Sequence, residues 1–358
     1  MVATVLVGAV TNLLTGLAKA EWVGRFLVPL IVGGALAVAF LVFAGIRDGH
    51  RAATGADSLR FTTAATGNPG NGVMYLMAVS QTGGLLMSTY QEPGRWSTWQ
   101  DLRPPTRPRD VAASVPQIDR LEVSYVDDIG QVWTTNLTPT DETPKWTRLP
   151  TATTVGRAIK LSALSNGLGH GEIFIVGEYG GVAHIWHGRG GMWAAEWGKM
   201  KPPGPGRDIA ASVPVNGLME IFVVAAGERI LNRWYRNDPE WWRTWGEGYG
   251  HGLPHSCVAI DVLNGWPNHH EIFVVRSDGG ISHRDHWQGA DPKPWRDLDA
   301  PVEMADVTAG ITSDGHLEVV AISRAGELWQ RSYSDASNWT EWRSLEIGRA
   351  AVSAYAQR

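Results

Sequence analysis

Short runs of apolar residues recur along this 358-residue chain, and each run leads through a glycine-containing turn into a second short run. One copy is GEIFIVGEYGGVAH, at residues 171–184. Related copies begin at Met74, Leu121, Met219, His270 and Leu317. Short apolar runs bounded by glycine turns are typical of β-strands, and runs without strict polar alternation indicate strands buried on both faces. The pattern therefore predicts six β-hairpins of one kind.

Two further signals accompany the hairpins. The first is a tryptophan before a short Leu or Gly stretch, which recurs as Trp99, Trp146, Trp197, Trp245, Trp295 and Trp342, at intervals of 47, 51, 48, 50 and 47 residues. The second is a strand of small residues, which begins at Val111, Ile159, Ile209, Cys257, Val307 and Ala350. Each unit thus holds about four short strands, and its period matches a β-propeller blade.

The repeat predicts an all-β fold over residues 59–358, a six-bladed β-propeller with four-stranded antiparallel blades. The first hairpin, at residues 74–87, has no tryptophan signal before it, and the last tryptophan has no hairpin after it. We therefore expect the ring to be closed by N- and C-terminal strands that complete one blade together, which removes free sheet edges. Residues 61–67 and 350–356 compete for the same strand position in that blade.

The N-terminal part has a different pattern. Residues 26–46 carry no charge, and at about 1.5 Å per residue they are long enough to cross a bilayer core as a helix. We predict a transmembrane helix there; a buried helix of a soluble protein and a cleaved signal peptide are the alternatives. Residues 1–25 form an apolar segment before this span, and residues 47–58 form a polar linker after it.

Positive charges are nearly balanced across the span, with Lys19 and Arg25 before it and Arg47 and Arg51 after it. The positive-inside rule therefore does not decide the orientation. We expect a single-pass membrane protein with its N-terminus inside and its propeller outside the cytoplasm, an orientation that follows from the function inferred for the C-terminal domain.

The amino-acid composition supports the all-β prediction and reduces the kinds of binding partner to be considered. The chain has 42 glycines and 18 tryptophans, which suits a large fold with many turns. Its formal net charge of −5 gives no electrostatic reason to expect a nucleic-acid partner. Cys257 is the single cysteine, so an intrachain disulfide is excluded. No cofactor is predicted.

Two repeated polar columns are candidates for function. A glutamate precedes the buried strand of five hairpins, as Glu122, Glu172, Glu220, Glu271 and Glu318. A repeated acid is more often a structural hydrogen-bond acceptor that ties one blade to the next than a ligand-binding group. After each turn, a second column reads Met87, Thr134, His184, Asn232, His283 and Gln330. Its donors and acceptors suit either a hydroxyl-rich ligand or a water-lined channel.

The tryptophans divide into two groups. Those that occur in every blade suit a structural wedge between blades, although stacking on a ligand is the alternative. Those that vary between blades are better candidates for stacking on the apolar face of a sugar ring. The predicted sugar-binding residues are His184, Trp186, Asn232, Trp234, Trp241, His283 and Trp287.

Catalytic and metal motifs give no comparable signal. The sequence has no GxSxG, phosphate-binding glycine loop or HExxH motif, and no unrepeated acidic pair stands out for acid–base chemistry. We therefore predict no enzyme activity, with a glycoside hydrolase or lyase as the remaining alternative. His251, His255 and Cys257 match no strong zinc spacing, and no metal site is predicted.

Two segments combine these signals best: RDVAASVPQIDRLEVSYV from Arg109 and RDIAASVPVNGLMEIFVV from Arg207. Their pattern resembles the PLL-like bacterial lectin propellers and, more distantly, the six-bladed fungal fucose lectins. The resemblance implies binding of fucose-type or O-methylated sugars in shallow pockets between blades, with the sugar stacked on a tryptophan. The expected function is that of a membrane-anchored, non-catalytic lectin. The alternative is a structural propeller that docks a protein partner in a membrane-associated assembly.

Overall fold

The computed structural model describes residues 59–347, apart from short gaps. The gaps are residues 68–72, 93–94, 118–119, 139–142, 166–168, 203, 216–217, 226–228, 236–244, 247–252, 254, 265–267, 288–289, 292, 313 and 335–337. The predicted transmembrane span at residues 26–46 and its flanking segments lie outside the described residues. Within the described residues, no helix is long and apolar enough to cross a membrane.

The described chain forms six antiparallel sheets, one for each predicted hairpin. Blade 1 contains β1 (Phe61–Gly67), β2 (Tyr75–Ser80), β3 (Leu85–Glu92), β4 (Arg95–Trp96) and β5 (Gln100–Asp101). Blade 2 contains β6 (Pro108–Gln117), β7 (Arg120–Asp127), β8 (Val132–Leu137) and β9 (Thr147–Arg148). Blade 3 contains β10 (Ala158–Ser165), β11 (Gly171–Gly177), β12 (Val182–His187) and β13 (Gly198–Met200).

The remaining three blades follow the same plan. Blade 4 contains β14 (Gly206–Val215), β15 (Leu218–Ala225) and β16 (Ile230–Tyr235), with an isolated bridge between Asn232 and Gly246 beyond β16. Blade 5 contains β17 (Cys257–Leu263), β18 (His269–Arg276), β19 (Ile281–Trp287) and β20 (Arg296–Asp297). Blade 6 contains β21 (Met304–Ile311), β22 (Leu317–Ser323), β23 (Leu328–Ser334), β24 (Asn338–Trp339) and β25 (Arg343–Ser344). The prediction of an all-β, six-bladed propeller is confirmed.

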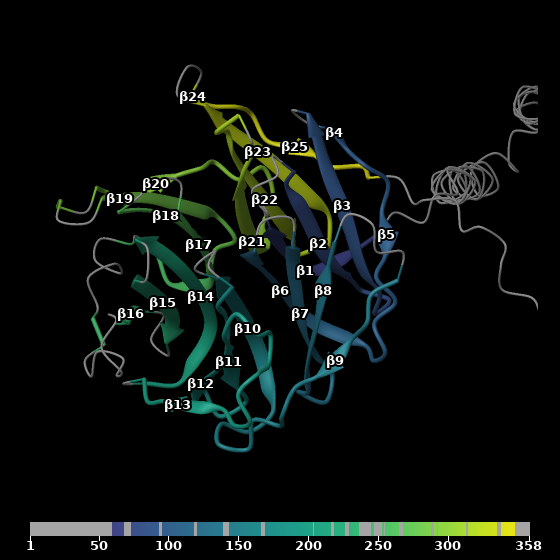
Figure 1. The fold of residues 1–358 in the computed structure, drawn as a ribbon. Coiled ribbons are helices and arrows are strands. Elements are labelled where there is room, and N and C mark those ends of the chain that lie inside the picture. Colours follow the sequence, from purple (N-terminus) through teal and green to yellow (C-terminus); the bar gives the residue numbers. More distant parts are fainter. Residues whose placement is uncertain are drawn as a thin grey trace, which may run out of the picture. The chain divides into compact units, whose positions relative to one another are not determined.

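The first strand of each blade lies nearest the centre of the ring (Figure 1). Neighbouring first strands contact one another all the way round, in the order β1, β6, β10, β14, β17, β21 and back to β1. The ring is therefore closed, and the six inner strands surround a common axis.

The prediction that one blade combines strands from both termini is wrong for the described residues. β1 pairs with β2 as the inner strand of blade 1, and each blade takes its strands from one continuous stretch of chain. The ring closes through contacts between blades 1 and 6: Phe61 N donates to Gly326 O (2.9 Å), and Thr66 Oγ1 donates to Ala309 O. Because β1 already fills the inner position, blade 1 needs no strand from the C-terminus. Residues 350–356 lie outside the described part of the chain.

Apolar side chains fill the space between neighbouring blades. The described core divides into six clusters, and each cluster combines side chains from two adjacent blades. All seven residues of β11 are buried, because Ile173 and Ile175 pack toward blade 2 while Phe174 and Val176 pack toward blade 4. This two-sided burial explains why the strands are continuously apolar in sequence.

The recurring tryptophans fix neighbouring blades to one another. Trp146 Nε1 donates to Leu102 O (3.1 Å), and Trp197 Nε1 donates to Pro150 O (2.7 Å). Equivalent bonds join Trp245 to Lys201 and Trp342 to Leu298. Each acceptor lies in the segment that follows the preceding blade, so the structure supports the wedge role for this column.

Candidate functional site

Five buried glutamates stand at the start of the second strand in blades 2 to 6, where each blade meets the next. Each glutamate faces a residue of the third strand that is diagonal to it on the same face of the sheet, twelve positions later in the chain. Asn232 Nδ2 donates to Glu220 Oε1 (2.7 Å). Matching contacts join His184 to Glu172, His283 to Glu271 and Gln330 to Glu318. In blades 3 to 6, the two polar columns of the sequence are thus partners.

Three of these glutamates also reach the following blade. His187 Nε2 of blade 3 lies 2.9 Å from Glu122 Oε2. His270 Nε2 of blade 5 lies 2.8 Å from Glu220 Oε2. Tyr90 Oη of blade 1 donates to Glu318 Oε1 (3.0 Å). The column therefore ties one blade to the next, which is the structural role that the sequence favoured for a repeated acid.

The surroundings of Glu172 and Glu220 shift their pKa values in opposite directions. Burial by itself raises the pKa of Glu172, but hydrogen bonds from His170 and His184 outweigh burial and lower that pKa below its usual value. Glu220 accepts a hydrogen bond from the Asn232 amide and lies beside the buried His270 imidazole, and burial raises its pKa well above the usual value. Burial also lowers the pKa of His270 to about 3. The same position of the repeat therefore favours the ionised form in blade 3 and disfavours it in blade 4.

Blade 3 carries the most open of these clusters. Trp186 lies opposite Glu172 in the β11–β12 ladder, and its side chain is 48% exposed. The His170 ring stacks against Trp186, with 6.2 Å between centroids and 24° between planes. His170 Nε2 lies 3.2 Å from Glu172 Oε2, and His184 holds the other carboxylate oxygen. We call His170, Glu172, His184 and Trp186 the blade-3 cluster. It presents a flat aromatic surface beside an ionised, hydrogen-bonded carboxylate.

A second exposed tryptophan lies in blade 5. Trp287 is 44% exposed and packs on the ring of His269, with 4.4 Å between centroids. On the same strand, Asp285 forms an ion pair with Lys293. His283 is buried between Glu271 and Trp339 of blade 6, whose ring centroid is 5.3 Å away. His283 therefore supports this surface from below, whereas Trp287 and Asp285 lie at its edge.

The other predicted residues are less accessible. Asn232 is buried, and half-buried Trp234 packs edge-on against His270 with 6.1 Å between centroids. These contacts fill the interface between blades 4 and 5. Trp241 lies outside the described residues. Among the described residues, the exposed tryptophans of these columns thus lie in blades 3 and 5, whereas Trp234 of blade 4 is half-buried.

Two contributors were missed in the sequence. His170 and His269 each lie two residues before a column glutamate and contact an exposed tryptophan of their own blade. Their shared spacing from Glu172 and Glu271 was visible in the sequence. Their association with Trp186 and Trp287 was not, because it depends on strand register. Among the described residues, no group of three or more His, Cys, Asp or Glu is arranged to hold a metal ion.

The fold and these clusters define a six-bladed β-propeller with buried acids and exposed tryptophans at its blade interfaces. No protein-family model matches the sequence, and a comparison with curated proteins gives no match. Solved structures match the fold. AofleA from Arthrobotrys oligospora aligns with a TM-score of 0.64 and 13% identity, covering 82% of this chain and 88% of its own.

Two lectins give similar alignments. The Aleuria aurantia lectin, described as a six-bladed β-propeller with a novel fucose recognition mode, has a TM-score of 0.55 and 11% identity, covering 83% of this chain and 98% of its own. The BP39L lectin from Burkholderia pseudomallei has a TM-score of 0.57 and 20% identity, covering 79% of this chain and 84% of its own. At these identities the likeness concerns the fold.

Proposed function

We propose that this protein is a non-catalytic, carbohydrate-binding propeller whose principal site is the blade-3 cluster. The observation that carries the proposal is the exposed ring of Trp186 beside the Glu172 carboxylate and two imidazoles. A sugar ring has an apolar face that stacks on an aromatic surface and hydroxyls that need both donors and acceptors. Trp287 with Asp285 offers a second site of the same kind. Several weak sites on one ring gain affinity for clustered glycans through avidity.

The sugar class proposed is fucose-type or O-methylated. The apolar methyl group of such a sugar suits stacking on Trp186, and the Aleuria aurantia lectin, which has the same fold, is described as having a fucose recognition mode. A neutral sugar also suits the mixed donor and acceptor character of the blade-3 cluster better than a charged ligand, because Glu172 is ionised.

A glycan array with the purified protein tests this proposal, followed by calorimetry with methyl fucoside. Trp186→Ala should weaken binding about tenfold or more, since a packed aromatic ring contributes on the order of 1–2 kcal/mol to a stacked contact. Tyr179→Ala is the matched control, because Tyr179 is an exposed aromatic in the turn at the opposite end of the same hairpin. A protein that binds no glycan on the array would instead favour the protein-docking alternative, and turnover of a glycoside would contradict the non-catalytic role.

We also propose that residues 26–46 anchor the propeller to a membrane, outside the cytoplasm. The support is the uncharged length of this segment. Protein expressed in cells should stay in the membrane pellet after alkaline extraction, and protease added from the outside should cleave the propeller. Release of the protein by alkaline buffer would contradict the anchor.

A further inference from the structure

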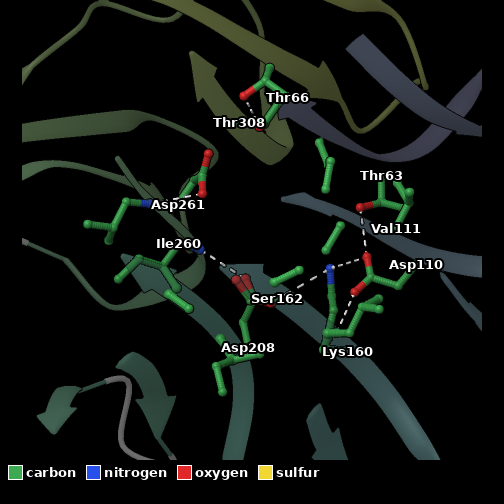
Figure 2. A pocket seen from close by; sticks show the side chains of 18 of the residues that line it. Thr63, Thr66, Asp110, Val111, Lys160, Ser162, Asp208, Ile260, Asp261 and Thr308 are labelled. Carbon is green, nitrogen blue, oxygen red and sulfur yellow. Dashed lines mark hydrogen bonds and ion pairs between the residues drawn. The ribbon is translucent and has the colours of Figure 1, made fainter. Parts of the chain in front are cut away.

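The inner strands enclose a cavity of about 170 Å³ on the propeller axis (Figure 2). Its walls carry four carboxylates, from Asp110, Asp208, Asp261 and Asp306, and one amine, from Lys160. Lys160 Nζ lies 3.4 Å from Asp110 Oδ1 and 3.8 Å from Asp208 Oδ1. Burial by itself lowers the pKa of Lys160, but the surrounding carboxylates outweigh burial and raise it, so the amine stays protonated.

Every blade has a β-bulge at the same end of its first strand, just before this cavity. The pairing register of the first strand shifts by one residue there in all six blades. The extra residues are Thr62, Arg109, Ile159, Arg207, Val258 and Ala305. A bulge re-aims the extra side chain relative to the ladder. The repeat therefore places one variable residue per blade around one mouth of the axial cavity.

A larger cavity, of about 490 Å³, opens at that mouth over blades 1 to 4. Four of the six bulge residues line it, including Arg109 and Arg207. Arg107 lines it as well and donates from Nη2 to Gln81 O (3.2 Å). Lys160 belongs to the walls of both cavities. The volume of the larger cavity falls in the range of small-molecule pockets, roughly 300–1,000 Å³.

The ionisable side chains of this mouth are mainly basic, whereas those of the axial cavity are mainly acidic. Its lining contains three guanidinium groups and the Lys160 amine, against one exposed carboxylate, Asp128. Asp110 and Asp208 contact Lys160 from the axial side and offset part of its charge. No ion pair joins Arg109 or Arg207 to another described residue, and both side chains are exposed. Two guanidinium groups are thus left to pair with a ligand.

We infer that this mouth binds a compact oxyanion, a carboxylate, sulfate or phosphate, carried by a molecule no larger than about a monosaccharide. The guanidinium fork matches the geometry of these groups and binds them through paired, charge-assisted hydrogen bonds. The site lies at the end of the inner strands, whereas the blade-3 cluster involves the second and third strands of one blade. It therefore gives the protein an acid-binding function separate from the neutral-sugar sites.

Calorimetry on the purified protein at low ionic strength tests the inference, with inorganic phosphate, sulfate and glucuronate as probes and glucose as the neutral control. At least one anion should bind while glucose does not, and raising the salt concentration should weaken binding. Preference for phosphate or sulfate over glucuronate would identify a free inorganic anion as the ligand. Preference for glucuronate would identify an acidic saccharide.

Variants assign the binding to this mouth. The double variant Arg109→Gln/Arg207→Gln should weaken anion binding at least about tenfold, since it removes two charge-assisted pairs. Arg148→Gln, an exposed arginine on the outer strand β9, is the matched control and should bind as the wild type does. Trp186→Ala should leave anion binding unchanged, which separates this site from the proposed sugar site. Unchanged binding in the double variant, equal loss in Arg148→Gln, or binding of none of the anions would overturn the inference.

Discussion

At the scale of single residues, the same position of the repeat has opposite electrostatic character in neighbouring blades. Glu172 accepts hydrogen bonds from two imidazoles and has a lowered pKa, whereas Glu220 lies beside Asn232 and a buried imidazole and has a raised pKa. Their relative exposure is nearly the same, so burial does not explain the difference. The partners explain it, because the hydrogen bonds and charge of two imidazoles favour the ionised form of Glu172, whereas Glu220 receives one hydrogen bond from a neutral amide.

This difference predicts opposite responses to the same substitution. Glu172→Gln should destabilise the protein at pH 7 by about 1.5–3 kcal/mol, the range for hydrogen bonds to charged groups. A lowered folded-state pKa stabilises the fold above the unfolded-state pKa, so this penalty should shrink as pH falls through the acid range. Urea unfolding from pH 7 down to below the ordinary pKa of a glutamate, about 4.3, measures it.

Glu220→Gln is the matched variant at the equivalent position. A raised folded-state pKa means that the wild-type protein loses stability as pH rises, because the acid ionises more easily in the unfolded chain than in the buried site. The glutamine has no such loss, so the variant should gain stability relative to the wild type toward alkaline pH. Parallel pH curves for the two variants would contradict the opposite pKa shifts of Glu172 and Glu220.

At the scale of elements, the hairpin turns set the distance between blades. Gly180 ends the turn between β11 and β12 with φ 75°, and its carbonyl accepts a hydrogen bond from Gly206 N (2.8 Å) of blade 4. A Cβ atom at Gly180 would lie 2.3 Å from Pro205 Cβ and 2.5 Å from Pro205 Cα. The turn glycine is therefore required both for its backbone conformation and for the close approach of the next blade.

Gly180→Ala should lower the free energy of unfolding by more than about 2 kcal/mol, since it adds a clash with backbone to the strain of a positive φ. Gly191→Ala is the control, because Gly191 also has a positive φ (69°) but nothing lies within 4 Å of the added Cβ. The free energy of unfolding of Gly191→Ala should fall by only about 1 kcal/mol, because this variant has the strain of the positive φ without a clash. Equal losses, measured by chemical denaturation, would show that the contact with Pro205 is unimportant.

At the scale of the whole molecule, the ring closes without sharing a blade between the termini. Phe61 of β1 packs in one cluster with Val320, Ile322 and Leu328 of blade 6. This cluster is of the same kind as the five clusters between consecutive blades. Each sheet therefore has a neighbour on both sides, and the closing interface is a core interface.

Closure by a core interface predicts that blades 1 and 6 are as tightly held as any other pair. Phe61→Ala should cost about 3–5 kcal/mol, as expected for a buried phenylalanine. Phe174→Ala, in the interface between blades 3 and 4, is the comparison and should cost about as much. Both variants should unfold in one cooperative step. A small loss in Phe61→Ala with a separate early transition would indicate an open array of blades, in which end units fray.

The sequence by itself determined the number of blades, the hairpin of each blade and the columns of glutamate and tryptophan. It did so because a period of about fifty residues with buried, continuously apolar strands has few solutions other than a ring. The structural roles of Glu122 and Trp146 followed from their repetition, since a residue type that recurs in most blades is expected at the contact that every blade makes with its neighbour.

Only the tertiary structure decided how the ring closes and where its exposed groups lie. Strand register, β-bulges and blade packing bring together residues that are distant in the sequence. They set the inner position of β1, the stacking of His170 on Trp186 and the placement of Arg109 and Arg207 at one mouth of the axial cavity. Arg109 and Arg207 are 98 positions apart in the sequence, yet they line the same cavity. They do so because two repeats carry the chain only part of the way round the propeller axis. The spacing of residues in the sequence shows the period of the repeat. The solvent exposure of a side chain depends on the residues that the neighbouring blade packs against it.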